Sequence, residues 1–315
     1  MINKVIKRFS VFTALLWTDQ AQSRQPLRFT TTQGLVFLLL IFGTNTMQVT
    51  AYSFEQKRTL VTGSSGGIGA GIAKALAQKG ARIIIHYNTR HEGALETERA
   101  ILDQGGICDG VVQCDFRNPK NIPQMFQILD RIWDGGIDIL VNNAGIITKL
   151  AVEDDDYEGT SFAETLQVNL NAPYLISKLA HDRMKGQKDG GVIINISSIH
   201  GFISVEWMTA YAASKAGLDR LTAGLACEWS KDKVRVNAVA PGIVPVERTS
   251  STLATKEAQE LWLPHLPVGR MGSVDECAHA VIYLCENEWT TGTILTLDGG
   301  MTARSNMPRR PKPTV

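Results

Sequence analysis

From residue 58 onward, the chain alternates between short runs of β-branched residues and longer segments with helical spacing. A typical run is Arg82–Tyr87, which reads Arg-Ile-Ile-Ile-His-Tyr. Short strands that are joined by helical crossovers form parallel sheets buried on both faces. The pattern therefore predicts an α/β fold, with a single doubly wound domain whose seven-stranded parallel sheet is flanked by helices.

The expected elements follow one another at short intervals, and no internal repeat interrupts them. Strands are expected at Arg58–Val61, Arg82–Tyr87, Gly110–Cys114, Asp138–Val141, Val192–Ile196, Val234–Val239 and Thr293–Leu297. Helices are expected at Ile68–Gly80, Glu92–Gln104, Pro119–Trp133, Thr160–Lys185, Tyr211–Trp229 and Val274–Glu286. One domain over residues 57–301 accounts for this order.

The two ends of the chain lie outside the pattern. Residues 1–56 are expected to be an N-terminal extension, and residues 302–315 a basic C-terminal tail. The apolar run Leu35–Phe42 would be about 12 Å long as a helix, against a bilayer core of roughly 30 Å, so no stable membrane insertion is expected. Three interpretations of residues 1–46 stay open: a disordered or misassigned leader, a membrane-surface or targeting segment, and a signal peptide.

Charge and cysteine content exclude some classes of protein. The net charge of +1 combines +4 on residues 1–46, +4 on residues 302–315 and −7 on residues 47–301. Such an acidic body does not favour nucleic acid as a partner. The five cysteines form no Cys-x-x-Cys pair and no zinc spacing, so we expect buried thiols in a reducing, cytoplasmic compartment and no bound metal.

A glycine-rich segment, Thr62–Gly69, stands between the first expected strand and the first helix. Glycines there let the backbone approach a pyrophosphate, which binds the free N–H groups of the helix start. A plain strand-to-helix turn is the alternative, because the spacing Gly-x-x-x-Gly-x-Gly differs from the common fingerprint. Asp115 is placed to accept a hydrogen bond from an adenine amino group. Asn142–Gly145 ends a strand where open sheets bind ligands, although an Asx turn would also explain it.

The end of the second strand bears on the choice of dinucleotide. It reads His86-Tyr87-Asn88-Thr89-Arg90 and contains no carboxylate to bind the adenosine ribose hydroxyls, as NAD would require. Asn88, Thr89 and Arg90 are instead suited to a 2′-phosphate. The sequence therefore favours NADP(H), with NAD as the alternative because position 66 in the loop is glycine and supplies no cation.

The segment Tyr211-Ala-Ala-Ser-Lys215 opens a helix and places its tyrosine and lysine one turn apart on the same face. A nearby ammonium favours the phenolate and so makes a tyrosine useful as an acid–base group. In isolation, such a pair is more often an ordinary feature of a helix surface. However, Ser197 and Ser198 end the fifth strand, and a hydroxyl there is suited to bind a substrate oxygen. Asn169 is an amide within a helix, where such a residue is mildly unfavourable and so suggests a function.

These motifs, with Pro241-Gly242 and Asp298-Gly299-Gly300, occur in the order and spacing of the short-chain dehydrogenase/reductases. The chain resembles that family over about residues 57–301, and most of all its branch of 3-oxoacyl-carrier-protein reductases and glucose dehydrogenases. The resemblance implies a Rossmann fold and a hydride transfer between a nicotinamide and a carbonyl or secondary alcohol. It also implies a homotetramer that pairs through residues 160–185 and the catalytic helix.

The resemblance also implies roles for individual residues. Tyr211 would be the general acid–base, and Lys215 would bind the nicotinamide ribose while favouring the phenolate. Ser198 would polarise the substrate oxygen, and Asn169 would hold a water in a proton relay. The cofactor contacts that it implies are Gly63, Ser65, Gly67, Ile68, Gly69, Asn88, Asp115, Phe116, Asn143, Ala144, Gly145, Tyr211, Lys215, Pro241, Gly242 and Ile243.

The chain departs from the family after Pro241-Gly242, where a threonine usually follows but Ile243–Glu247 stands here. We expect a small-molecule substrate, with its wall formed by residues 147–158, 200–208 and 244–267. Within that wall we place Trp207, together with Ser198 and Tyr211, in contact with the substrate. Trp262 could be part of a lid or of the core. The alternative to an active enzyme is a catalytically silent nucleotide-binding protein with the same fold.

Overall fold

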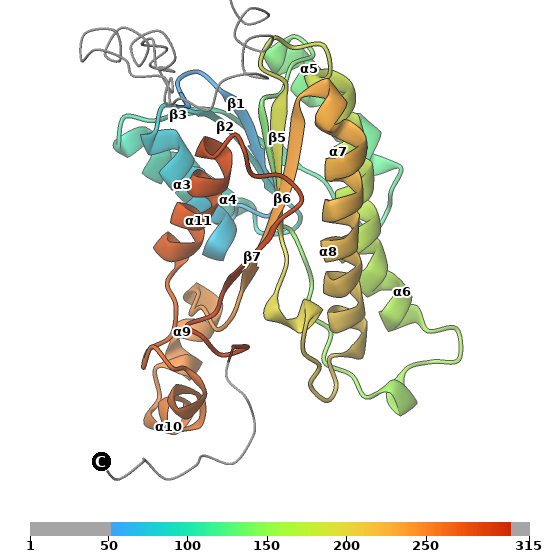
Figure 1. Ribbon diagram of the computed structural model, residues 1–315, viewed down its shortest axis with the longest axis vertical. Helices are drawn as coiled ribbons and strands as arrows, with labels where there is room; N and C mark the ends of the chain where they lie inside the picture. Colours follow the sequence, from blue (N-terminus) through green and yellow to red (C-terminus); the bar gives the residue numbers. More distant parts are fainter. Residues whose placement is uncertain (1–51, 304–315) are drawn as a thin grey trace, which may run out of the picture. The chain divides into compact units, whose positions relative to one another are not determined.

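The computed structural model of the protein describes residues 52–303. The predicted N-terminal extension and C-terminal tail thus lie almost entirely outside the described residues. Seven parallel strands form one sheet in the order β3-β2-β1-β4-β5-β6-β7, which confirms the predicted fold class (Figure 1). The strands are β1 Arg58–Val61, β2 Arg82–Tyr87, β3 Ile107–Gln113, β4 Ile139–Asn142, β5 Gly191–Ile196, β6 Val234–Pro241 and β7 Ile294–Leu297.

Helices cover both faces of the sheet (Figure 1). They are α3 Gly67–Gln78, α4 His91–Asp103, α5 Asn121–Trp133, α6 Thr160–Leu166, α7 Ala172–Met184, α8 Thr209–Trp229, α9 Glu247–Leu253, α10 Lys256–Trp262 and α11 Val274–Glu286. Residues of α3, α4 and α11 form one apolar core with the sheet, and residues of α5, α7 and α8 form the other.

The isoleucines of β2 show why the sequence folds in this way. Successive side chains of a strand point to opposite faces, so Ile83 and Ile85 enter the core under α3, whereas Ile84 enters the core under α5. All three are fully buried. A continuous apolar run is thus needed here, because each face of the strand meets a layer of helices.

The order of the strands also determines where a ligand can bind. The chain runs outward from β1 to β3 and then returns to β4, which pairs with β1 on its other side. Crossovers leave in opposite directions at this point, so a crevice opens at the carboxyl ends of β1 and β4. The glycine-rich segment and Asn142–Gly145 directly follow these two strands.

Three expectations about the elements were wrong or incomplete. The helix expected over residues 160–185 is divided into α6, a π-helical turn at Gln167–Asn171, and α7. The third strand begins earlier than expected, at Ile107, and its register against β2 shifts between Ile83 and Ile84. Residues 244–267 contain α9 and α10, which lack a strong apolar period and were not predicted.

The cysteines are free thiols, but they are not all buried. Cys114, Cys277 and Cys285 are buried, Cys108 is half-buried, and Cys227 on α8 is exposed, so the expectation of burial was wrong for Cys227. Burial raises the pKa of the Cys277 thiol to about 12 and so keeps it protonated. Within residues 52–303, no helix is long and apolar enough to cross a membrane.

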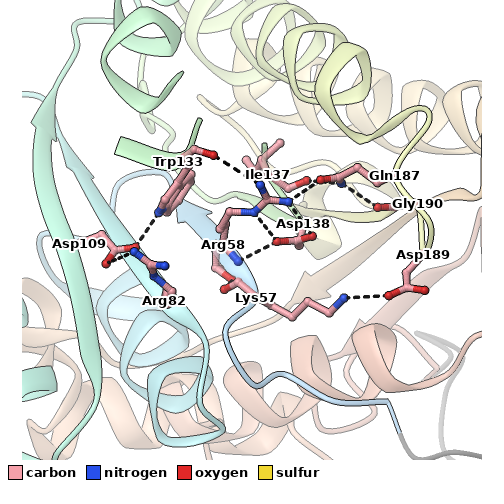
Figure 2. Close-up of polar contacts among 11 residues, drawn as sticks. Lys57, Arg58, Arg82, Asp109, Trp133, Ile137, Asp138, Gln187, Asp189 and Gly190 are labelled. Atoms are coloured by element: carbon pink, nitrogen blue, oxygen red, sulfur yellow. Dashed lines mark hydrogen bonds and ion pairs between the residues drawn. The ribbon is translucent and has the colours of Figure 1, made fainter. Parts of the chain in front are cut away.

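A polar network ties the strands together at their amino ends, opposite the crevice (Figure 2). Arg58 at the start of β1 donates from its backbone N–H and its Nε to Asp138 before β4, at 2.9 and 2.8 Å. Arg82 of β2 forms a two-point ion pair with Asp109 of β3, at 2.8 and 3.0 Å. Trp133 at the end of α5 donates its indole N–H to Asp109 at 2.6 Å. Paired charges thus join the starts of β1 and β4, and those of β2 and β3.

Candidate functional site

A cleft of about 580 Å³ opens at the carboxyl ends of the strands. This volume is within the usual range for a small-molecule or cofactor site. All sixteen residues expected to contact the cofactor line it, and so does Ser198. The fold therefore brings together residues that are up to 180 positions apart in the sequence, such as Gly63 and Ile243.

The glycine-rich loop is packed too closely for side chains at two positions. A Cβ on Gly63, whose φ is +64°, would lie 2.8 Å from the Cα of Ala144. A Cβ on Gly69 would overlap the Asn143 amide and the Gly63 carbonyl. Thr62 Oγ1 accepts hydrogen bonds from the N–H groups of Asn143 and Ala144, at 2.9 and 3.0 Å. The turn after β4 thus fixes the position of the glycine-rich loop after β1, and residues of both segments line the cleft.

His86 supports this loop from beneath, a role that the sequence analysis did not identify. The Gly63 N–H donates to His86 Nδ1 at 2.9 Å, so the ring is neutral and its Nε2–H donates to the Cys114 carbonyl at 3.0 Å. The ring also stacks on Phe116, with centroids 4.3 Å apart. Burial lowers the pKa of His86 to about 4. The strand pattern offered a signal, since a histidine at the fourth position of an otherwise apolar buried run needs polar partners.

A cation lies beside the loop although Gly66 supplies none. A Cβ on Gly66 would lie 2.7 Å from Arg90 Nη1, so the glycine leaves room for the guanidinium of Arg90, which directly precedes α4. Arg117 also lines the cleft, where it pairs with Asp115 and Glu164. Arg90, which is 24 positions away in the sequence, thus supplies the cation that position 66 lacks.

Tyr211 and Lys215 also line the cleft, and both lie on α8. Lys215 is buried, and its Nζ donates to the Ile196 carbonyl at 2.8 Å. Its ammonium lies 5.6 Å from the centroid of the Tyr211 ring, which confirms that the two side chains share a face of the helix. Burial lowers the pKa of Lys215 to about 8, and the nearby Asp219 opposes this effect. The group therefore remains mostly an ammonium at neutral pH.

Ser198 ends β5 beside this pair. Its side chain is 7% exposed, and its Oγ accepts a weak hydrogen bond from the His200 N–H at 3.3 Å. The hydroxyl hydrogen is therefore available to an oxygen in the cleft. Tyr211 also meets His200 edge to face, with ring centroids 5.8 Å apart. A serine hydroxyl and a phenol thus both line the cleft.

Asn169 does not line the cleft but lies directly behind it. Its Oδ1 accepts from the Ile146 N–H at 2.8 Å, and its Nδ2 donates to the Ile146 carbonyl at 2.9 Å and to Ser214 Oγ at 3.1 Å. The π-helical turn at Gln167–Asn171 surrounds it, and such turns frequently occur at functional sites. The position of Asn169 within a helical segment is thus explained, because its side chain joins the loop after β4 to α8.

Neither Trp207, which was expected to contact the substrate, nor Trp262, for which a lid and the core were both open, is among the described residues that line the cleft. Trp207 is 62% exposed with φ +64°, and its carbonyl accepts from the Leu150 N–H at 2.9 Å. Trp262 on α10 is half-buried. The cleft does receive side chains from two of the segments expected to form the substrate wall, residues 147–158 and 244–267, and also from Ile146. These are Ile146, Ile147, Val244, Val246, Glu247, Thr249 and Leu253.

The acidic loop before α6 serves local structure. Asp155 accepts from the N–H groups of Ser161 and Phe162, both at 3.2 Å, and Asp156 accepts from the Thr160 N–H at 2.7 Å. Carboxylates that bind the free N–H groups of a first turn stabilise a helix start. These contacts give Asp155 and Asp156 a local structural role at the start of α6.

Comparisons with known proteins agree with this geometry. A family model described as enoyl-(acyl carrier protein) reductase matches residues 63–302. The 3beta-hydroxysteroid dehydrogenase 1 of Eggerthella lenta is 36% identical over 248 residues, which cover 78% of this chain and 94% of that protein. Acetoin dehydrogenase from Enterobacter cloacae superposes with a TM-score of 0.72 at 29% identity, over 81% of this chain and 99% of that structure. Gluconate 5-dehydrogenase from Burkholderia cenocepacia, solved with NADP and tartrate, superposes with a TM-score of 0.73 at 27% identity, over 82% and 99%.

Proposed function

The chain belongs to the short-chain dehydrogenase/reductase family and is an NAD(P)-dependent oxidoreductase acting on CH–OH groups. From this premise, we propose that it interconverts an uncharged, largely apolar ketone and the corresponding secondary alcohol, with NADP(H) as the cofactor. The observation that carries the proposal is the buried ammonium of Lys215, held between the Ile196 carbonyl and the Tyr211 ring at the end of the cleft. A buried charge costs free energy, so it is expected where chemistry requires it.

The cleft fits a nicotinamide dinucleotide. Glycines 63 and 69 bring bare backbone to the cleft where any Cβ would clash, as a pyrophosphate site requires. Arg90, Ser198, Tyr211 and Lys215 all line this cleft. When bound, the nicotinamide supplies or accepts the hydride at the carbon of the C–O bond.

In the direction of reduction, Tyr211 donates its phenolic proton to the carbonyl oxygen as negative charge develops there. The Lys215 ammonium favours the phenolate that remains and so makes the phenol a better acid. Ser198 donates a hydrogen bond to the same oxygen and stabilises its charge in the transition state. Asn169 acts behind the cleft, as a positioning residue that fixes Ile146 against α8.

The preference for NADP(H) rests on Arg90. Its guanidinium occupies the space above Gly66, near Asn88 and Thr89, which also line the cleft. Guanidinium groups bind phosphate oxygens through charge-assisted hydrogen bonds worth about 1.5–3 kcal/mol, or roughly 10- to 100-fold in affinity. Arg90→Ala should weaken NADPH binding by about that factor and leave NADH binding within twofold. Arg99→Ala, on the exposed part of α4, is the control. Equal losses for both dinucleotides would contradict an NADP-selective role.

The proposed substrate class rests on the aliphatic side chains of the cleft. Among the described residues that line it, Ile146, Ile147, Val244 and Leu253 supply apolar surface. The cationic lining residues Arg90 and Arg117 lie by Gly66 and Asp115, at the dinucleotide end. A sugar acid would place a carboxylate against aliphatic side chains, at a cost in desolvation. We therefore favour a cyclic or steroid-like ketone over a sugar acid.

The test combines a substrate panel with one variant. Wild-type protein is assayed with NADPH and NADH against cyclic ketones, a 3-ketosteroid, acetoin and a keto-sugar acid. Tyr211→Phe should lower kcat by about 10²- to 10⁴-fold with NADPH affinity nearly unchanged, because only the proton donor is lost. Tyr157→Phe, in the exposed acidic loop, is the matched control.

Two outcomes would overturn parts of the proposal. Full activity of Tyr211→Phe would remove the phenol from the chemistry. Tight NADPH binding without turnover on any ketone or alcohol would favour a catalytically silent binding protein instead. A preference for the keto-sugar acid would overturn the substrate class alone.

We further propose a homotetramer in the cytoplasm. Phe162 of α6 and Tyr174 of α7 are exposed large side chains on the helices expected to pair, and the five free thiols suit a reducing compartment. Light scattering of the purified protein should give four times the chain mass, and a monomeric mass would contradict the proposal.

A further inference from the structure

A carboxylate already occupies the backbone donor that opens the proposed pyrophosphate site. The Gly67 N–H donates to Glu247 Oε2 at 2.8 Å, a contact between residues 180 positions apart. Gly67 is the first residue of α3, and no side chain of its own segment caps this helix start. Both residues line the cleft. Glu247 thus acts as the capping anion that the sequence of α3 does not provide.

The position is favourable for any anion. Free N–H groups and the helix dipole attract negative charge to a helix start, which is why phosphates bind there. The first turn of α3 contains no acidic residue to compete for this role. The Glu247 carboxylate and a phosphate oxygen would therefore compete for the Gly67 N–H, and their negative charges would repel each other.

The contact also holds a complete element in place. Glu247 is the first residue of α9, and Val246 Cγ1 would lie 3.3 Å from a Cβ on Gly67, so the start of α9 rests directly on the loop. The other side-chain hydrogen bonds described for α9, from Thr249 and Ser250, stay within the helix and its cap. Glu247 is therefore the polar link between α9 and the dinucleotide loop.

We propose that Glu247 is an internal competitor of the cofactor pyrophosphate: it holds α9 against the glycine-rich loop, and binding of the dinucleotide displaces it from the Gly67 N–H. This inference rests on the proposed dinucleotide site and adds a regulatory contact to it. The carboxylate lowers cofactor affinity, because the incoming phosphate must first break a charge-assisted hydrogen bond. In return, the loop and α9 stay ordered in the cofactor-free protein.

The direct test is the affinity for NADPH, measured by titration of nicotinamide fluorescence. Glu247→Gln keeps the shape and removes the charge, and Glu247→Ala removes the contact. Both should bind NADPH about three- to tenfold more tightly than wild type, since a partly exposed charge-assisted bond is worth about 1 kcal/mol. The gain should shrink between 50 and 500 mM salt, because salt screens the repulsion.

A matched control separates the contact from the overall charge. Glu257→Gln changes the same charge on the exposed start of α10, outside the cleft lining, and should leave the affinity unchanged. Equal tightening by Glu257→Gln would mean that the general field is responsible, and would overturn the role of the contact. Unchanged or weaker NADPH binding by both Glu247 variants would overturn the proposal itself.

Hydrogen exchange of the cofactor-free protein provides a readout that needs no dinucleotide. Glu247→Ala should speed exchange of the amides at Gly67 and in α9 by at least fivefold, with α8 unaffected. Wild-type protein that binds no NADPH but shows this change would refute the proposed dinucleotide function and keep the contact. Unchanged exchange, with normal NADPH binding by wild type, would refute the contact and keep the function.

Discussion

The buried ammonium of Lys215 makes a quantitative prediction about stability. Burial lowers the pKa of this group from 10.5 to about 8, so the folded protein binds its proton less tightly than the unfolded chain does. At pH 7.5 this difference removes about 3 kcal/mol from the free energy of unfolding, at 1.36 kcal/mol per pH unit. At pH 9.5 the folded protein has already lost the proton, and the remaining penalty is about 1 kcal/mol.

The sign follows from proton linkage. Between pH 8 and 10.5 the unfolded state binds more protons at this site, so wild-type stability rises with pH there. Lys215→Met keeps an unbranched side chain but cannot titrate. Loss of the hydrogen bond to the Ile196 carbonyl affects the variant equally at every pH, so it cancels from the pH dependence. Wild type should therefore gain about 2 kcal/mol relative to Lys215→Met between pH 7.5 and 9.5.

The assay is urea unfolding of cofactor-free protein at both pH values and equal protein concentration. Lys256→Met, at an exposed position on α10, is the control, and its difference from wild type should not change with pH. A pH-independent difference for Lys215→Met would refute the reasoning, because it would mean that the ammonium is not desolvated. A fall in the stability of wild type relative to Lys215→Met between pH 7.5 and 9.5 would refute the predicted direction of the pH effect.

Three shorter predictions test other parts of the structure. The pKa of His86 is lowered to about 4, so the free energy of unfolding of the wild type should fall by about 2–3 kcal/mol between pH 7 and 4.5. Urea unfolding of His86→Leu at the two pH values should lack this part of the acid sensitivity. Asp138→Ala leaves the partly buried Arg58 unpaired and should cost about 2–4 kcal/mol by urea unfolding, with the affinity for NADPH within twofold of wild type. Arg235→Met removes the donor to two carbonyls in the last turn of α11 and to that of Thr290 before β7, so the melting temperature should fall by several degrees, whereas Arg235→Lys should recover part of the loss.

Local patterns allowed much of the fold to be predicted from the sequence. The isoleucines of β2 indicate a strand buried on both faces. The helix expected at Val274–Glu286 has the same bounds in the structure, where Ser273 and Glu276 form a capping box at its start. By contrast, α9 and α10 are short and carry polar residues on most sides, so their form depends on contacts that the sequence does not reveal. The division of the helix at Asn169 depends likewise on partners in the loop after β4.

The cleft, like the fold, could be predicted only where the relevant contacts are local in the sequence. Tyr211 and Lys215 are one helical turn apart, and their shared face follows from helix geometry alone. The pairing of Arg90 with the empty space at Gly66 depends on how α4 starts, and the contact of Glu247 with Gly67 joins residues from opposite ends of the domain. Sequence reasoning noted the missing cation at position 66 and the unusual segment after Pro241. It could not supply the three-dimensional neighbours that explain both.

The polar network at the amino ends of the strands has a consequence for how such a chain can change (Figure 2). Its ion pairs, such as that of Arg82 with Asp109, hold the architecture from one edge of the sheet, whereas the cleft-forming loops emerge from the other. Variation in residues 244–267 can therefore reshape what the cleft accepts while the charges that hold the strand starts stay untouched. A search for altered selectivity can diversify that segment freely, and a search for greater heat resistance can begin at the opposite edge.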